Sequence, residues 1–151
     1  IKDKGTQIEY VALHVGLGTF MPVKTENLED HTMHSEDFFV EQEVITRINN
    51  AKKNGKRIVA VGSTSTRVLE TLANTNNKLQ ITNKNSTNIF IYPPYKFKFV
   101  DVMITNFHLP KSTLMALVYA FGGTRLMKKA YKEAIKEKYR FYSFGDSMII
   151  L

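Results

Sequence analysis

The sequence predicts an α/β protein with a mixed, largely parallel and barrel-like β core and flanking helices. Short apolar runs typical of strands alternate along the chain with amphipathic helical patterns. Clusters of polar side chains follow the predicted strand ends, which is the edge where α/β folds place their functional sites. The chain has 151 residues, of which 43% are hydrophobic, and this is enough for one domain with a substantial core.

The composition excludes several classes of protein. No apolar run reaches the length of a membrane-spanning helix, and the lack of cysteine excludes disulfide bonds and thiolate chemistry. We therefore expect a cytoplasmic protein without membrane association. The formal net charge of +7 suggests a polyanionic partner such as a nucleic acid. Because Ile1 is not an initiator methionine, we interpret the chain as part of a longer protein.

The first predicted strand covers residues 10–15, where apolar and more polar side chains alternate. This strand brings His14 to its carboxyl end. Gly16 and Gly18 follow directly, and glycines at that place allow a sharp turn and the close approach of a ligand to the main chain.

A polar cluster lies at residues 30–36, where two acids, two imidazoles and a hydroxyl occur within seven residues. This composition suits proton transfer, metal binding or recognition of a polar ligand. A zinc site formed by His14, His31 and His34 is one alternative. A hydrogen-bonded core residue is an equally open interpretation of His14 alone.

A helix at 41–54 and a buried strand at 56–62 precede a second cluster of hydroxyl side chains. The cluster consists of Ser63, Thr64, Ser65 and Thr66. It stands at the start of a helical pattern, so its backbone N–H groups could receive an anion or a ribose, with Arg67 near by. Plain helix capping explains the same residue types.

The remaining elements follow from the same patterns. Residues 74–88 are asparagine-rich, and we expect a surface excursion without chemistry. Further strands are predicted at 88–92, 95–100 and 101–105, then an aromatic strand from 139 and an apolar strand to the end. Helices are predicted at 113–121, capped by Ser112, and at 124–138.

The second half of the chain adds a further set of candidate residues. Asn106 and His108 follow the predicted strand at 101–105, and Asp146 is either a turn-former or a placed carboxylate. A lysine stripe at 128, 132 and 136 follows one helix face. A solvated helix face and contact with an RNA backbone both remain open for that stripe.

Several of these stretches together resemble one family, the S-adenosylmethionine:tRNA ribosyltransferase-isomerases of queuosine biosynthesis. The matching segments are LHVGLGTF (13–20), PV (22–23), MHSE (33–36), IVAVGSTSTR (58–67), TNFHLPKS (105–112) and YRFYSFGDSM (139–148). Their order along nearly the whole chain is far more specific than any single motif. Pro94 departs from the family pattern, which has a glycine there.

The resemblance implies that residues 1–151 are the carboxyl-terminal part of a catalytic α/β domain, with the family's small β-barrel domain absent from this fragment. It implies transfer and isomerisation of the ribosyl part of S-adenosylmethionine onto 7-aminomethyl-7-deazaguanine at the tRNA wobble position. The product would be epoxyqueuosine tRNA, with adenine and methionine released. S-adenosylmethionine is then a consumed co-substrate, and we expect no metal and a monomeric enzyme.

We expect the imidazoles and acids of the matching motifs to converge in one cleft. As the catalytic base we consider His14 or His34, with Glu36 or Asp30 fixing its tautomer. The substrate-binding candidates are Gly16, Gly18, Thr19, Asp30, Ser63, Thr64, Ser65, Arg67, Asn106, His108 and Asp146. Competing hypotheses are a metal-dependent hydrolase that uses His14, His31 and His34, and a non-catalytic RNA-binding module.

Overall fold

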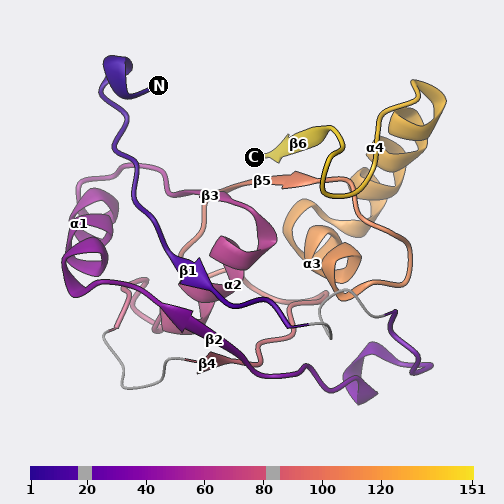
Figure 1. Ribbon diagram of the computed structural model, residues 1–151, viewed down its shortest axis with the longest axis horizontal. Helices are drawn as coiled ribbons and strands as arrows, with labels where there is room; N and C mark the ends of the chain where they lie inside the picture. Colours follow the sequence, from indigo (N-terminus) through magenta and orange to yellow (C-terminus); the bar gives the residue numbers. More distant parts are fainter. Residues whose placement is uncertain (17–21, 81–85) are drawn as a thin grey trace.

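The computed structural model describes residues 1–16, 22–80 and 86–151, and these residues form two small sheets and four α-helices (Figure 1). The first sheet contains β1 (Ala12–Leu13), β2 (Glu36–Phe39) and β4 (Ser86–Thr87). The second contains β3 (Val59–Val61), β5 (Val102–Asn106) and β6 (Ser147–Ile150). The helices are α1 (Gln42–Lys53), α2 (Ser63–Leu72), α3 (Thr113–Gly122) and α4 (Thr124–Lys136). Short 3-10 turns lie at Lys2–Lys4 and Leu28–Asp30.

The α/β class is confirmed, but the largely parallel core is wrong for the described strands. Only β3 and β5 pair in parallel, whereas β1–β2, β2–β4 and β5–β6 are antiparallel. Two successive helices, α3 and α4, connect β5 to β6. The chain therefore enters β6 from the edge at which β5 ended, and an antiparallel strand results. Within the described ranges the strands form two separate sheets and no closed barrel.

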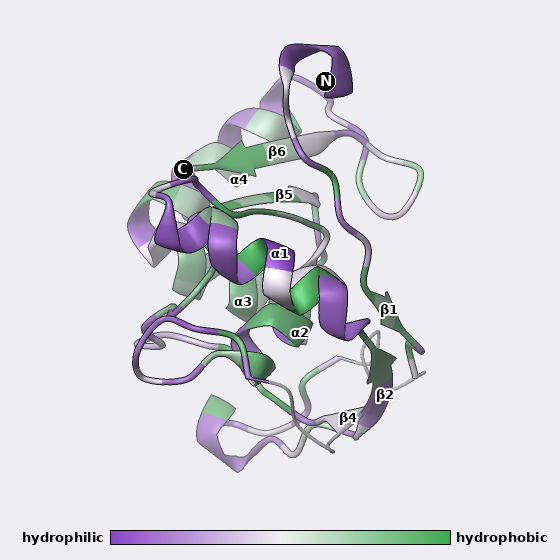
Figure 2. Ribbon diagram, turned by 90° about the vertical axis from the view of Figure 1, so that its left-hand side faces the viewer, coloured by the Kyte–Doolittle hydropathy of each residue, from purple (hydrophilic) through white to green (hydrophobic). Residues whose placement is uncertain are grey.

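The helices follow their predicted ranges closely. α1 buries Val44 and Ile45 and exposes its opposite face, so hydrophobic and hydrophilic residues alternate along it (Figure 2). α3 begins where predicted, because the Ser112 hydroxyl accepts a hydrogen bond from the backbone N–H of Met115 at 3.1 Å. Among the described helices, none combines the length and apolar composition that crossing a bilayer requires.

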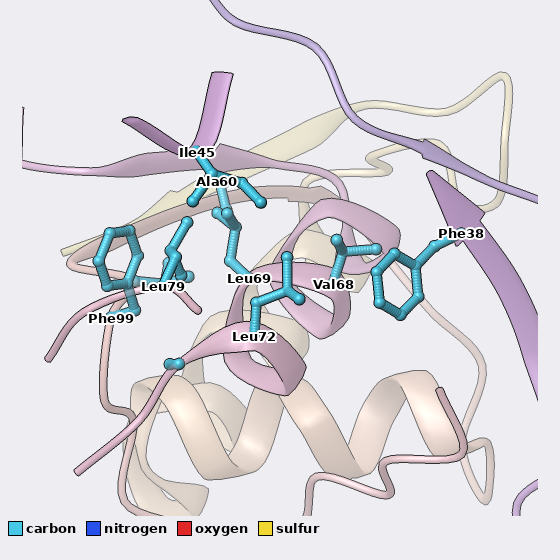
Figure 3. Close-up of a cluster of buried hydrophobic side chains, with 10 residues drawn as sticks. Phe38, Ile45, Ala60, Val68, Leu69, Leu72, Leu79 and Phe99 are labelled. Carbon is cyan, nitrogen blue, oxygen red and sulfur yellow. The ribbon is translucent and has the colours of Figure 1, made fainter. Parts of the chain in front are cut away.

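α2 is the most deeply buried element. Every residue from Thr66 to Glu70 is buried. Its apolar side chains belong to one core cluster with Phe38 of β2, Ile45 of α1 and Phe99, and Figure 3 shows Val68 extending from the helix toward Phe38. A second cluster packs α3 and α4 against the inner face of β5 and β6.

The segment 88–100 contains no strand, although the sequence predicts strands at 88–92 and 95–100. The carboxylate of Glu70, which is 2% exposed, takes the place of a neighbouring strand. Its Oε1 accepts the N–H groups of Phe99 (2.9 Å) and Val100 (3.0 Å), and its Oε2 accepts the N–H of Lys98 (2.8 Å). The Tyr95 hydroxyl donates to the same Oε2 at 3.0 Å, and burial beside Glu70 raises the Tyr95 pKa well above its usual range.

Three other predictions about burial and strands are wrong. The predicted aromatic strand from 139 is a turn, held by hydrogen bonds described below. Leu126 and Ile135 of α4 are exposed, although the apolar pattern of the sequence places them toward the core with Met127, Ala130 and Ala134. The predicted buried strand at 56–62 is an edge strand whose Val61 is exposed, since Val61, Ile104 and Ile149 form one cross-strand row on the outer face of the sheet.

The contacts of Glu70 lead to a first prediction. Replacing Glu70 with Gln is expected to lower the free energy of unfolding by about 2–4 kcal/mol, because an amide nitrogen cannot accept the buried donors that face it. Urea unfolding followed by circular dichroism measures this change. Glu43→Gln, on the exposed face of α1, is the control and should change stability by less than about 0.5 kcal/mol. Equal effects of the two substitutions would contradict the role assigned to Glu70.

Candidate functional site

A buried ion pair connects the two sheets through α2. Glu36 of β2 and Arg67 of α2 are each 3% exposed, and the Arg67 Nη1 binds the Glu36 Oε2. The other carboxylate oxygen accepts the N–H of Gly16 at 2.8 Å. Arg67 Nε also donates to the Ile89 carbonyl at 3.4 Å. Glu36 therefore holds Gly16, which follows β1, and α2 in fixed positions relative to β2.

This ion pair leads to a second prediction. Glu36→Gln is expected to lower the free energy of unfolding by about 3–5 kcal/mol, because it leaves the Arg67 charge buried without its counter-charge. The double variant Glu36→Gln/Arg67→Met should be more stable than Glu36→Gln alone, since it removes that charge as well. Urea unfolding of the two single variants and the double variant measures the coupling. If the losses of stability in the two single variants simply add in the double variant, the proposed coupling between Glu36 and Arg67 is contradicted.

His14 and His34 lie at one end of the first sheet, where β1 ends and β2 begins. Both imidazoles belong to exposed residues, and the N–H of His14 donates to the Asp37 carbonyl at 2.8 Å. The register of β1 and β2 places His14 directly opposite Asp37, which is also exposed. Asp37 is therefore a carboxylate beside a candidate base, and the sequence analysis missed it because only cross-strand register reveals this neighbour.

The other candidates of the first half are more scattered. Asp30 is exposed in the turn Leu28–Asp30, and its carboxylate accepts the Asn27 amide at 3.3 Å. His31 is half-buried, and its ring centre lies 5.1 Å from that of Phe90 in an edge-to-face arrangement. Gly18 and Thr19 lie outside the described residues. Among those that are described, no group of three or more His, Asp and Glu side chains is arranged to hold a metal ion.

A second group of candidates gathers where β3 and β5 end. Gly62, with a φ of 94°, ends β3 and donates its N–H to the Ile104 carbonyl at 2.8 Å. α2 then begins at Ser63, so the hydroxyls of Ser63, Thr64 and Ser65 belong to the first helical turn and are partly buried. The capping interpretation is wrong for this cluster, because Gly62 occupies the N-cap position. First-turn N–H groups have no partner within their own helix and are directed toward this edge of the sheet.

Asn106 and Asp146 shape the neighbouring part of the same edge. Asn106 pairs with Ser147 of β6, and its amide donates to the carbonyls of Gly145 and Asp146 at 3.4 Å each. The Asp146 carboxylate accepts the N–H of Arg140 at 2.8 Å and binds its guanidinium at 3.0 Å. These hydrogen bonds from Arg140 hold the pKa of Asp146 below its usual value. Asp146 thus holds this turn together, as one of the two interpretations predicts.

His108 is held inside the sheet edge as a neutral side chain. Its Nε2 lies 2.7 Å from the Thr105 hydroxyl, and its backbone N–H donates to the Tyr131 hydroxyl at 3.0 Å. Burial lowers the pKa of His108 to about 4. The imidazole is therefore uncharged at neutral pH and suits a hydrogen bond to a neutral ligand.

The lowered pKa of His108 leads to a third prediction. The folded protein leaves His108 unprotonated down to about pH 4, whereas the unfolded chain protonates it near pH 6.5. The unfolded state then binds more protons in this window, so His108 lowers the free energy of unfolding by up to about 1.4 kcal/mol per pH unit as the pH falls from 6.5 to 4.

Urea unfolding at a series of pH values tests this. His108→Gln should show a shallower loss of stability between pH 6.5 and 4 than the parent chain. His34→Gln, which removes an exposed imidazole, is the matched control and should keep the parent slope. An NMR titration that places the His108 ring near its ordinary pKa would contradict the assignment.

Comparisons with known proteins identify the family of this chain. A family model described as a queuosine biosynthesis protein matches residues 1–150. The chain belongs to this family. An S-adenosylmethionine:tRNA ribosyltransferase-isomerase of Halothermothrix orenii is 56% identical over 151 residues, which are 100% of this chain and 44% of the relative. A relative of the same name in Clostridioides difficile is 55% identical over 150 residues, with 99% and 44% covered.

A solved structure extends this likeness to the fold. The crystal structure of an S-adenosylmethionine tRNA ribosyltransferase from Thermotoga maritima matches with a TM-score of 0.76 and 42% identity, and the match covers 99% of this chain and 47% of that chain. The family predicted from the motifs is confirmed. The chain spans less than half the length of the curated relatives that it matches in this queuosine biosynthesis family.

The structure collects ten of the predicted residues in two groups joined by α2, whereas Asp30 lies apart from both. The first group contains His14, Gly16, Glu36 and Arg67. The second contains Ser63, Thr64, Ser65, Asn106, His108 and Asp146. Convergence of both groups in one cleft remains a prediction. One depression formed by described residues has a volume of about 760 Å³. It is lined by residues of α1 and of the segment 74–80, and none of the predicted site residues is among them.

Proposed function

We propose that residues 1–151 form the carboxyl-terminal part of the catalytic domain of an S-adenosylmethionine:tRNA ribosyltransferase-isomerase. The match of the family model to residues 1–150 is the observation that carries this proposal. The reaction transfers and isomerises the ribosyl part of S-adenosylmethionine onto 7-aminomethyl-7-deazaguanine at the tRNA wobble position. Epoxyqueuosine tRNA forms, and adenine and methionine leave.

The chemistry requires a base near the sulfonium of S-adenosylmethionine. The sulfonium acidifies the adjacent ribose carbon, so an imidazole can remove a proton there. His14 and His34 are the candidates, because both are exposed at the same end of the β1–β2 pair. Glu36 is bound to Gly16 and Arg67 and so positions the backbone at Gly16, two residues after His14. Asp37, opposite His14, supplies the carboxylate that orients this imidazole.

The departing adenine requires hydrogen-bond donors and acceptors rather than charges. Asn106 and the neutral His108 offer such groups at the end of β5. The first turn of α2 adds backbone N–H groups and the hydroxyls of residues 63–65, which suit ribose hydroxyls or a phosphate. An amine nucleophile on the modified base must then be held in line with the sugar.

The fourth prediction tests this function in a chimera, in which this chain replaces the matching 44% of the Halothermothrix orenii relative. The chimera, incubated with S-adenosylmethionine and precursor-bearing tRNA, should release adenine, which chromatography measures. His14→Ala or His34→Ala should lower kcat by about 100-fold or more with KM changed far less, because a general base contributes about this much. His31→Ala, which removes a half-buried imidazole packed on Phe90, is the control.

Three results would contradict the proposal. Unaltered turnover in both His14→Ala and His34→Ala would refute the base assignment. A folded chimera that binds tRNA and releases no adenine would indicate an RNA-binding module. Stoichiometric metal in elemental analysis, together with loss of activity on chelation, would favour the metal-dependent hydrolase.

A further inference from the structure

We propose that the outer face of α4 and the turn at residues 140–146 form the surface that binds the tRNA. In this arrangement the cations of α4 contact backbone phosphates, and the ring of Phe144 stacks on an unpaired base. The proposal rests on the proposed function, because it takes tRNA as the substrate. It adds the path that the tRNA follows and the residues that hold it.

The charges of this segment lie on one side of the helix. Residues 124–140 contain seven Lys and Arg residues and only two Glu residues. Arg125, Lys128, Lys129 and Lys132 are all exposed, at the spacing i, i+3, i+4 and i+7 that defines one helix face. The buried residues of α4, Met127, Tyr131 and Ala134, occupy the opposite face. The cations therefore project away from the protein.

Intramolecular ion pairs leave most of this positive charge available. Lys136 binds Glu133 at 2.9 Å and Glu137 at 3.3 Å, so both acids of the segment are engaged at the end of α4. In the part of the chain that the structure describes, no ion pair involves the four cations of the preceding turns. A row of cations extending over about 10 Å of helix matches a polyanionic backbone.

The turn after α4 presents an aromatic ring to solvent. The side chain of Phe144 is 98% exposed, although phenylalanine is normally among the most buried residues. The turn is fixed by the bonds between Asp146 and Arg140 and by the bond from the N–H of Gly145 to the Tyr142 carbonyl at 2.9 Å. A Cβ added to Gly145 would meet the Arg140 carbonyl at 2.4 Å, so the backbone is packed tightly here.

The same turn adjoins the candidate site. The N–H of Tyr142 donates to the Phe107 carbonyl at 3.1 Å, and the Phe107 ring packs against those of Tyr139 and Phe141. Phe107 lies between Asn106 and His108 in the chain. A nucleic acid along α4 and this turn would therefore lead its bases to the carboxyl end of β5.

Cations beside an exposed aromatic ring are typical of surfaces that bind single-stranded RNA. The wobble base lies in an unpaired loop, whose bases are available for stacking. A stretch of chain from the remainder of a full-length relative could also cover Phe144. That occupant predicts a loss of stability instead of a loss of tRNA affinity.

The fifth prediction concerns the cations and uses filter binding of tRNA to the chimera, without turnover. Lys128→Ala/Lys132→Ala should weaken binding about tenfold at low salt and lower the slope of log K against log salt by about 1.4–1.8, since each phosphate contact contributes about 0.7–0.9. Lys53→Ala/Lys56→Ala removes the same charge at the end of α1, on the opposite side of the molecule (Figure 1). This control should stay within about twofold of the parent.

The ring is tested in the same assay. Phe144→Ala should weaken tRNA binding about tenfold with an unchanged salt slope, because stacking is not ionic, and Phe144→Trp should restore it. Tyr10→Ala, which removes another exposed ring, is the control. Thermal unfolding and the affinity for S-adenosylmethionine alone should be unchanged in Phe144→Ala.

Three outcomes for individual variants would overturn the inference. They are equal losses in the two double-lysine variants, a lower unfolding temperature in Phe144→Ala with unaltered tRNA affinity, and a selective loss of S-adenosylmethionine affinity. Adenine release with unaltered tRNA affinity in every variant would refute this surface alone. The expected losses of tRNA affinity without adenine release in the parent chimera would refute the proposed activity alone.

Discussion

The ion pair between Glu36 and Arg67 is the interaction on which the rest of the structure depends. A buried charge is strongly unfavourable unless a counter-charge reaches it, so β2 and α2 can only be buried together. α2 follows β3 directly, and β3 belongs to the second sheet, where it pairs with β5. The pair therefore couples the sheet that bears His14 and His34 to the sheet edge that bears Asn106 and His108. The relative placement of the two candidate groups follows from this one contact.

α2 also supplies Glu70, whose carboxylate accepts the backbone N–H groups of a distant segment. This contact explains one failure of the prediction from the sequence. The helices were predicted well because their apolar spacing and the cap at Ser112 are local signals. The strand predicted at 95–100 was wrong because a distant carboxylate satisfies the N–H groups of Lys98, Phe99 and Val100. Alternating aromatic residues indicate that one side of a segment is buried. They do not indicate which group accepts the hydrogen bonds of its backbone N–H groups.

The same difference between local and long-range signals applies to the candidate site. Alternation in the first strand correctly placed His14 at the carboxyl end of that strand, although it left a core position open, and the motif order correctly indicated the family. The partners of those residues depend on long-range register and packing. Asp37 becomes the neighbour of His14 only through the β1–β2 pairing, and Arg67 meets Glu36 only after α2 is packed. Composition identified the reactive groups, but it contains no information about these pairings.

The charges at the sheet edge and on α4 suit the two proposed substrates, a sulfonium compound and a polyanion. Two arginines of this region are each matched by a carboxylate, Arg67 by Glu36 and Arg140 by Asp146. Burial keeps His108 uncharged as well. Under the proposed function a sulfonium would approach this edge, and the pairing of the two arginines removes two unmatched cations that would repel it. Arg125, Lys128, Lys129 and Lys132 of α4 form no ion pair within the described residues, so they are available to a tRNA backbone in the proposed complex.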